Sequence, residues 1–211
     1  MAEFPKLYDA ILNGDESTAV QLTDEALKQG ADPSELITRW MIPAMDEVGR
    51  LFEAQEYYVP ELLLAGRAMK AALELIRPLL TAQGVHPTGR IVLGTVKGDL
   101  HDIGKNLVGS MLEGAGFEVH DLGIDVSEVK FVEAVKNRDP DILALSALLT
   151  VTMPEMKKVI GALNEAGIRN QVKVLVGGAP VTWEFAEQIG ADGYGDNASS
   201  AVTVARSLLK K

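Results

Sequence analysis

The stretch from Gly94 to Phe117, GTVKGDLHDIGKNLVGSMLEGAGF, joins a buried strand to a helix through a polar loop. Its first residues end an apolar run, which is typical of a buried strand, and its second half is typical of a helix. A phosphate-binding loop in this place would be rich in glycine and carry a lysine. This loop instead has Asp99 and His101 two residues apart. A histidine and an aspartate at this position indicate a ligand other than a phosphate.

The chain after this strand alternates between apolar runs and amphipathic segments. The strand candidates are residues 90–96, 117–123, 141–149, 172–178 and 191–195. Strands that alternate with helices form a parallel sheet covered on both faces. We therefore predict an α/β domain of the flavodoxin-like, doubly wound type with a five-stranded parallel sheet. Such folds bind ligands beyond the carboxyl ends of the strands, which is where the Asp99–His101 loop lies.

The chain before residue 87 predicts only helices. Asp15 and Asp32 precede two of them as capping residues. Pro43 is expected to kink or split the third helix, and Pro78 is expected to end the fourth. Four helices with short connections indicate an antiparallel bundle. We thus predict a helical domain over residues 1–86 and the α/β domain over residues 87–211, with a hinge around Gly84.

Composition and charge exclude several classes of protein. The chain has 211 residues, a net charge of −10 and no cysteine. The acidic balance argues against binding of nucleic acid or anionic lipid. Without cysteine there is no disulfide framework and no thiolate metal site. We find neither a transmembrane run nor a signal peptide, so we expect a cytoplasmic protein without a membrane partner.

Small and hydroxyl residues follow the third and fourth predicted strands. Ser146, Thr150 and Thr152 follow the third strand, and Gly177 and Gly178 end the fourth. Because glycine has no side chain, we expect an elongated ligand to lie against the backbone at the glycine pair. Together these residues predict a long slot at one rim of the sheet, with His101 at its mouth.

Three short motifs then resemble a known family. Asp99-x-His101-x-x-Gly104 is followed after 41 residues by Ser146-x-Leu148, and after 28 more by Gly177-Gly178. This order and spacing resemble the cobalamin-binding domains of the methionine synthase type. The N-terminal half is similar to the helical cap of that family, notably VGRLFEAQEYYVPELLLAGRAMKAALELIRPLL at residues 48–80. The resemblance therefore covers nearly the whole chain.

The resemblance implies a role for each motif residue. It implies that cobalamin binds base-off, with His101 on cobalt from below and Asp99 on the other ring nitrogen. Thr152 stands where the family has a serine that continues this relay. The resemblance also implies that Gly104 belongs to the cofactor-binding residues. The residues that match the positions binding the tail of the cofactor are Ser146, Leu148, Thr150, Gly177 and Gly178.

Three further residues leave alternatives open. Lys105 is either a phosphate contact or a solvated lysine, and Trp183 belongs either to the core or to a wall of the slot. Glu61 falls near a place where methionine synthase has an apolar residue. This departure leaves the upper face of the cofactor site open.

The chain most resembles the stand-alone corrinoid proteins of anaerobic methyltransferase systems. That resemblance implies a methyl carrier between cob(I)alamin and methylcob(III)alamin states, which does not turn over substrate alone. Its implied partners are a methyltransferase for a methyl ether, methylamine, betaine or methanol, a second methyltransferase acting on tetrahydrofolate or coenzyme M, and a reductive activase. Two alternatives are a cobalamin-based sensor, which tight DNA binding would support, and a mutase cobalamin subunit, which activity with adenosylcobalamin would support.

Overall fold

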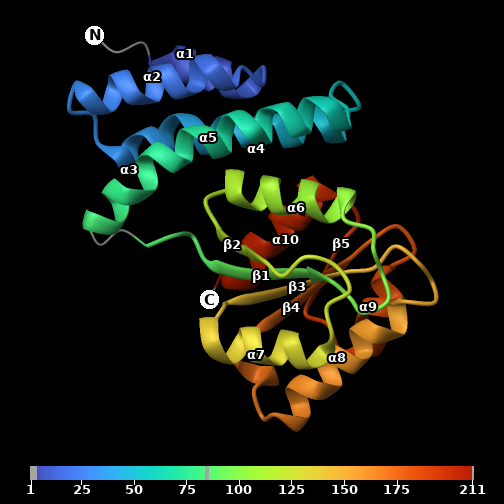
Figure 1. Cartoon of the computed structure of the whole chain (residues 1–211). Helices are drawn as coiled ribbons and strands as arrows, with labels where there is room; N and C mark the ends of the chain where they lie inside the picture. The colour runs from blue at the N-terminus through green and yellow to red at the C-terminus, as the bar shows by residue number, and fades with distance from the viewer. Residues whose placement is uncertain (1–3, 84–85, 211) are drawn as a thin grey trace. The chain divides into compact units, whose positions relative to one another are not determined.

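The computed structural model describes residues 4–83 and 86–210 and divides into two compact units (Figure 1). One unit comprises Met1–Thr88 with Ser110–Gly116, and the other comprises Gly89–Gly109 with Phe117–Lys211. The first unit is helical, and the second contains the sheet. The domain limits given above, 1–86 and 87–211, stay a prediction, and Gly84 of the expected hinge lies outside the described residues.

Two helices of the helical unit begin at capping residues that the sequence predicts. The helices of this unit are α1 (Phe4–Leu12), α2 (Glu16–Lys28), α3 (Pro33–Leu36), η1 (Ile37–Met41), α4 (Ile42–Glu53) and α5 (Val59–Gln83). The Asp15 carboxylate accepts a hydrogen bond from the Thr18 N–H at 3.0 Å, and Asp32 accepts one from the Ser34 N–H at 3.1 Å. Both predicted caps are therefore confirmed.

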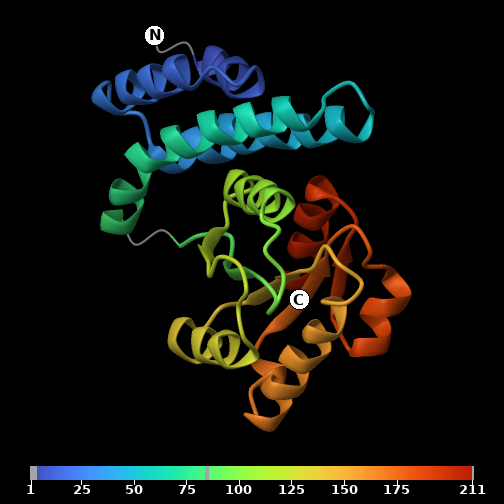
Figure 2. The same ribbon diagram turned by 45° about the vertical axis from the view of Figure 1, so that its right-hand side comes forward.

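The two prolines inside the helical unit act differently. Ahead of Pro43 the chain forms the π-helical turn η1, in which the Ile42 N–H donates to the Ile37 carbonyl. This change from α to π hydrogen bonding confirms the predicted disturbance of the third helix. The prediction for Pro78 was wrong, because α5 continues through it to Gln83. A proline within a helix removes one hydrogen bond and kinks it, and Figure 2 shows the last part of α5 turning away from its first part.

Apolar side chains at helical spacing hold the bundle together. Along α5 the fully buried face contains Leu62, Ala65, Met69 and Ile76. This face packs against both α2 and α4, while α1 packs against α2 and α4. Such a stripe at intervals of three and four residues is what a helix buries in a bundle. The predicted four-helix bundle is therefore confirmed.

All five predicted strands form, and all pair in parallel. They are β1 (Arg90–Thr95), β2 (Glu118–Asp121), β3 (Ile142–Ser146), β4 (Lys173–Gly177) and β5 (Gly193–Gly195). Their order is β2-β1-β3-β4-β5, which confirms the flavodoxin-like fold. The order reverses between β1 and β3, so the loops that follow these two neighbouring strands start side by side and lead to opposite faces of the sheet.

Helices cover both faces of this sheet (Figure 1). Helices α7 (Glu128–Arg138), α8 (Met153–Glu165) and α9 (Trp183–Ile189) lie on one face, over a core that includes Val92, Leu143 and Val174. Helices α6 (Ile103–Gly114) and α10 (Ala198–Leu209) lie on the other face, and the short η2 (Arg169–Gln171) precedes β4. Burial on both faces explains why residues 142–145 are all apolar. In residues 4–83 and 86–210, no helix has both the length and the hydropathy needed to span a membrane.

Candidate functional site

The loop between β1 and α6, residues 96–102, is here called the histidine loop. Gly98 adopts a left-handed conformation with φ +78°, and the Asp99 N–H donates to the Val96 carbonyl at 3.1 Å, which closes a tight turn. The buried hydroxyl of Thr95 donates to the His101 carbonyl at 3.0 Å. These contacts fix the backbone of the loop directly beyond the end of β1.

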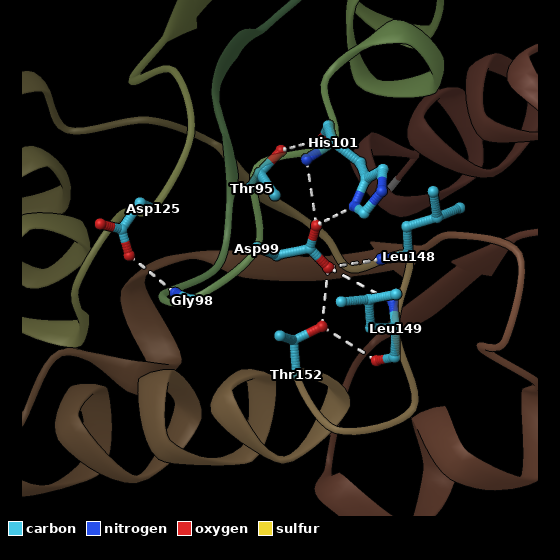
Figure 3. A network of polar contacts seen from close by, with 8 residues as sticks. All are labelled: Thr95, Gly98, Asp99, His101, Asp125, Leu148, Leu149 and Thr152. Atoms are coloured by element: carbon cyan, nitrogen blue, oxygen red, sulfur yellow. Dashed lines mark hydrogen bonds and ion pairs between the residues drawn. The ribbon is translucent and has the colours of Figure 1, made fainter.

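Within the histidine loop, Asp99 and His101 point toward each other (Figure 3). The His101 Nδ1 lies 2.8 Å from Asp99 Oδ1, and the His101 N–H donates to the same oxygen at 3.1 Å. Because a carboxylate only accepts hydrogen bonds, Nδ1 bears the proton of the neutral ring. The Asp99 side chain is fully buried, whereas the His101 side chain is 50% exposed. The Nε2 lone pair on the far side of the ring is therefore free to bind a ligand.

The second oxygen of Asp99 joins the histidine loop to the loop after β3. Oδ2 accepts from the Leu148 N–H at 2.8 Å, the Leu149 N–H at 3.3 Å and the Thr152 hydroxyl at 2.7 Å. The structure thus brings His101, Asp99 and Thr152 together in the predicted order (Figure 3). The sequence predicted a strand over residues 141–149, but β3 ends at Ser146, so residues 147–149 belong to a loop. Because the N–H groups of Leu148 and Leu149 do not pair within the sheet, they can donate to Asp99.

Hydrogen bonding keeps Asp99 ionised despite its burial. Burial alone raises the pKa of this carboxyl, but bonds from the Thr152 hydroxyl, the Leu148 N–H and His101 outweigh it. The net result is a pKa well below the usual range for aspartate. A negative charge therefore faces Nδ1 of His101 and orients the ring.

The other motif residues lie around the same ends of the strands. Ser146 is the last residue of β3, Thr150 is exposed, and Leu148 is 41% exposed. Gly104 is in the first turn of α6, and a Cβ built on it would meet nothing within 4 Å. Gly104 is itself exposed, so this position is open to solvent.

The structure gives a reason for the glycine pair that does not involve a ligand. A Cβ on Gly177 would lie 2.8 Å from the Gly195 carbonyl oxygen, and one on Gly178 would lie 1.9 Å from the Ala147 carbonyl oxygen. Gly178 also has φ +132°, which side chains rarely adopt. The missing side chains therefore make room for the protein's own backbone. Whether the pair also contacts a ligand stays a prediction.

The structure answers part of each question left open for Lys105, Glu61 and Trp183. The Lys105 side chain is buried and its Nζ donates to Asn106 and Asp121, so Lys105 is not a solvated lysine. Glu61 accepts from the Tyr58 N–H at 2.9 Å and so caps α5, which explains an acidic residue at this position. Trp183 is 50% exposed, so it does not belong to the core.

Asp125 is a contact of the histidine loop that sequence reasoning missed. It follows β2 and accepts a hydrogen bond from the Gly98 N–H at 2.7 Å. Asp125 and Gly98 are 27 residues apart in sequence, and no local pattern joins them. The available signal was the position of Asp125 at the carboxyl end of the strand that neighbours β1.

Comparison with known proteins identifies the family. Residues 89–203 match a family described as the B12 binding domain, and residues 4–77 match a second family of the same description. The chain belongs to the B12-binding proteins. The resemblance to cobalamin-binding domains is thereby confirmed, and a cobalamin or related corrinoid is the class of cofactor that these domains bind.

Relatives of this B12-binding protein cover nearly its full length. It is 45% identical over 97% of its length to trimethylamine corrinoid protein 1 of Methanosarcina acetivorans, of which 95% is covered. It is 46% identical over 90% of its length to dimethylamine corrinoid protein 1 of the same organism, of which 90% is covered.

Two solved structures also match. A cobalamin-binding protein from Desulfitobacterium hafniense is 34% identical with a TM-score of 0.82, and each chain is covered completely. A chain of the methanol:cobalamin methyltransferase complex of Methanosarcina barkeri is 31% identical with a TM-score of 0.82. That match covers 97% of this chain and 83% of the other.

Proposed function

We propose that this B12-binding protein is the methyl-carrying corrinoid protein of a methylamine methyltransferase system. The relatives that support this proposal are corrinoid proteins named for trimethylamine and dimethylamine, at 45% and 46% identity. The match in the methanol system is more distant, at 31% identity. We therefore favour a methylamine over methanol, a methyl ether or a betaine as the methyl donor.

The observation on which the proposal depends is the Asp99–His101 pair. A half-exposed imidazole whose Nδ1 donates to a buried carboxylate has the arrangement of a metal-ligating histidine. We infer that His101 Nε2 binds the cobalt of the corrinoid, which is then base-off. The corrinoid, when bound, supplies a cobalt that accepts a methyl group and gives it up again. The protein's part is to hold, orient and deliver it.

The other residues divide this work between them. Asp99 holds the ring of His101 in one orientation and Thr152 holds Asp99, so the axial nitrogen is presented without rearrangement. We assign Gly104, Ser146, Leu148, Thr150, Gly177 and Gly178 to the nucleotide tail. Gly104 and Leu148 are both exposed, so a ligand can reach these two positions. Leu148 would contact the tail with its side chain while its N–H holds Asp99.

We further infer that the chain acts only with partner proteins. Its likeness to a chain from a methyltransferase complex supports a substrate methyltransferase as the first partner. A second methyltransferase, acting on tetrahydrofolate or coenzyme M, would take the methyl group, and a reductive activase would restore an oxidised cofactor. We therefore do not expect turnover of a methylamine by the purified chain.

A transfer experiment tests this function. The chain reconstituted with hydroxocobalamin and reduced is mixed with an extract of its source cells and with trimethylamine, dimethylamine, monomethylamine or methanol. We expect the absorption spectrum of the cofactor to change with a methylamine, and to change much more slowly without extract. The matched control is His101→Gly, which should bind cobalamin without the nitrogen splitting that electron paramagnetic resonance shows for the cob(II) parent. No change with any donor, or unchanged splitting in His101→Gly, would contradict the proposal.

A further inference from the structure

The segment after β2 runs beside the histidine loop beyond the end of the sheet. The Thr95 N–H donates to the Gly123 carbonyl, and the Val126 N–H donates to the Thr95 carbonyl, both at 3.0 Å. Val96 and Val126 also form an isolated parallel bridge. Residues 123–126 are therefore held against β1 by backbone hydrogen bonds on both sides of Asp125.

Asp125 exchanges two hydrogen bonds with the histidine loop. Its Oδ1 accepts from the Gly98 N–H at 2.7 Å (Figure 3). Its own N–H donates to the Asp99 carbonyl at 3.1 Å. The first bond is charge-assisted and short, as expected for a carboxylate that accepts from a backbone N–H. Because the two bonds run in opposite directions, they fix both the position and the direction of the segment Gly98–Asp99.

The backbone of Asp125 adopts a left-handed conformation, which few residue types adopt. Its φ is +51°, in the left-handed region that favours glycine and, among other residues, asparagine and aspartate. A glycine would satisfy the backbone but not the Gly98 N–H. Aspartate combines the left-handed backbone with an acceptor of the right length.

We propose that Asp125 is a positioning residue for His101, acting through Gly98 and Asp99. Asp99 is then held at two points: Thr152 and two N–H groups hold its carboxylate from the loop after β3, and Asp125 holds its backbone from the loop after β2. Since the imidazole of His101 rests on the Asp99 carboxylate, a shift of the Asp99 backbone moves the ring. One part of this proposal, that His101 is the cobalt ligand, rests on the function proposed above.

Three variants of the chain separate the effect of the Asp125 carboxylate from that of the left-handed backbone. Asp125→Gly removes the acceptor but suits the backbone, and Asp125→Asn keeps both an amide oxygen and tolerance of a left-handed φ. Asp139→Gly is the matched control, because Asp139 is also left-handed with φ +45° but contacts Arg90, the first residue of β1. That contact lies at the opposite end of β1 from the histidine loop.

The first measurement is amide hydrogen exchange on the cofactor-free chain. We expect exchange in residues 97–102 to be about tenfold faster in Asp125→Gly, because two bonds that close the loop are weakened, and near the parent rate in Asp125→Asn and Asp139→Gly. Exchange in residues 97–102 that stays within about twofold of the parent in Asp125→Gly would overturn the proposal. This measurement needs no corrinoid, so it stands whether or not His101 binds cobalt.

The second measurement is nitrogen splitting in the cob(II) form of the same variants loaded with cobalamin. Asp125→Gly should have a smaller fraction of cobalt with a protein nitrogen, and Asp125→Asn should restore it. Faster exchange with an unchanged fraction would also overturn the proposal, since the loop would then move without displacing His101. If the parent itself shows no splitting that depends on His101, the proposed function fails, and the exchange result alone reports how Asp125 holds the loop.

Discussion

At the scale of the residue, the buried carboxylate of Asp99 is the feature on which most contacts of the site converge. It accepts hydrogen bonds from three backbone N–H groups, a hydroxyl and an imidazole, and it is fully buried. A group with this many donors has little freedom to change its partner or its charge. We therefore expect the pair of Asp99 and His101 to be formed before any cofactor binds.

The lowered pKa of Asp99 predicts how stability depends on pH. Because the folded-state pKa lies below the unfolded value of 3.8, the carboxylate stabilises the fold above pH 3.8, and this stability is lost as the pH falls further. Asp99→Asn puts an amide donor opposite a donor, so we expect a loss of about 1–3 kcal/mol at pH 7. Denaturant unfolding of the cofactor-free chain measures it.

The unfolding free energy of Asp99→Asn should approach that of the parent at low pH. We expect the difference in unfolding free energy between parent and Asp99→Asn to shrink as the pH falls from about 4 to about 2. The exposed Asp196, between β5 and α10, provides the control: Asp196→Asn should change stability little at either pH. A difference for Asp99→Asn that is constant with pH would show that its carboxylate is not the source of the effect.

At the scale of the element, the ends of β3 and β4 are packed backbone to backbone. The Cβ of a residue at position 178 would lie 1.9 Å from the Ala147 carbonyl oxygen, and no side-chain rotation relieves such a contact. The two chain segments can therefore reach this separation only with glycine at position 178, directly after β4. Backbone packing thus requires this glycine whether or not a ligand also contacts it.

Substitution of two glycines should separate packing from binding. We expect Gly178→Ala to lower the unfolding free energy of the cofactor-free chain by about 2 kcal/mol or more, from backbone strain and displacement of Ala147. Gly104→Ala, where a Cβ meets nothing within 4 Å, should leave that stability unchanged or slightly raised. If Gly104 contacts the cofactor, its variant should instead bind cobalamin more weakly. Equal stability of the two variants would show that the glycine pair is not needed for packing.

At the scale of the whole molecule, the division into two compact units suggests how one cofactor could serve two partner proteins. Both methyltransferases of the proposed system need access to the same bound corrinoid. We therefore expect the helical unit and the sheet unit to move relative to each other during methyl transfer. Such a change must be linked to the state of the cofactor if it is to follow the reaction. The segment between Ala82 and Arg90 is the predicted hinge.

Limited proteolysis of the full chain tests this expectation. We predict that a protease cuts between Ala82 and Arg90 faster in one of the methyl, cob(II) and cob(I) states than in another, because the segment is presented differently when the units move. His101→Gly should reduce the difference, since ligation is the proposed source of the state dependence. Identical cleavage rates in all three states would count against a hinge linked to the cofactor.

The sequence by itself determined the class of fold and most of the site. The alternation of apolar and amphipathic runs after residue 90 predicts five parallel strands, because the period of the pattern depends only on neighbouring residues. The caps at Asp15 and Asp32 are local for the same reason. The resemblance to cobalamin-binding domains then implied one relay of His101, Asp99 and Thr152, and the structure brings these three side chains into contact.

Only the tertiary structure decided the features that join distant segments. Thr152 is 53 residues from Asp99 and Asp125 is 27 residues from Gly98, and these contacts exist because β1 lies between β2 and β3. The same holds for Gly178, whose neighbour Ala147 belongs to another strand end. At Pro78 the local rule predicted the end of a helix, whereas α5 continues through this proline to Gln83. Local rules report the preference of a segment, whereas the burial and hydrogen bonding of a side chain depend on which other segments the sheet order places beside it.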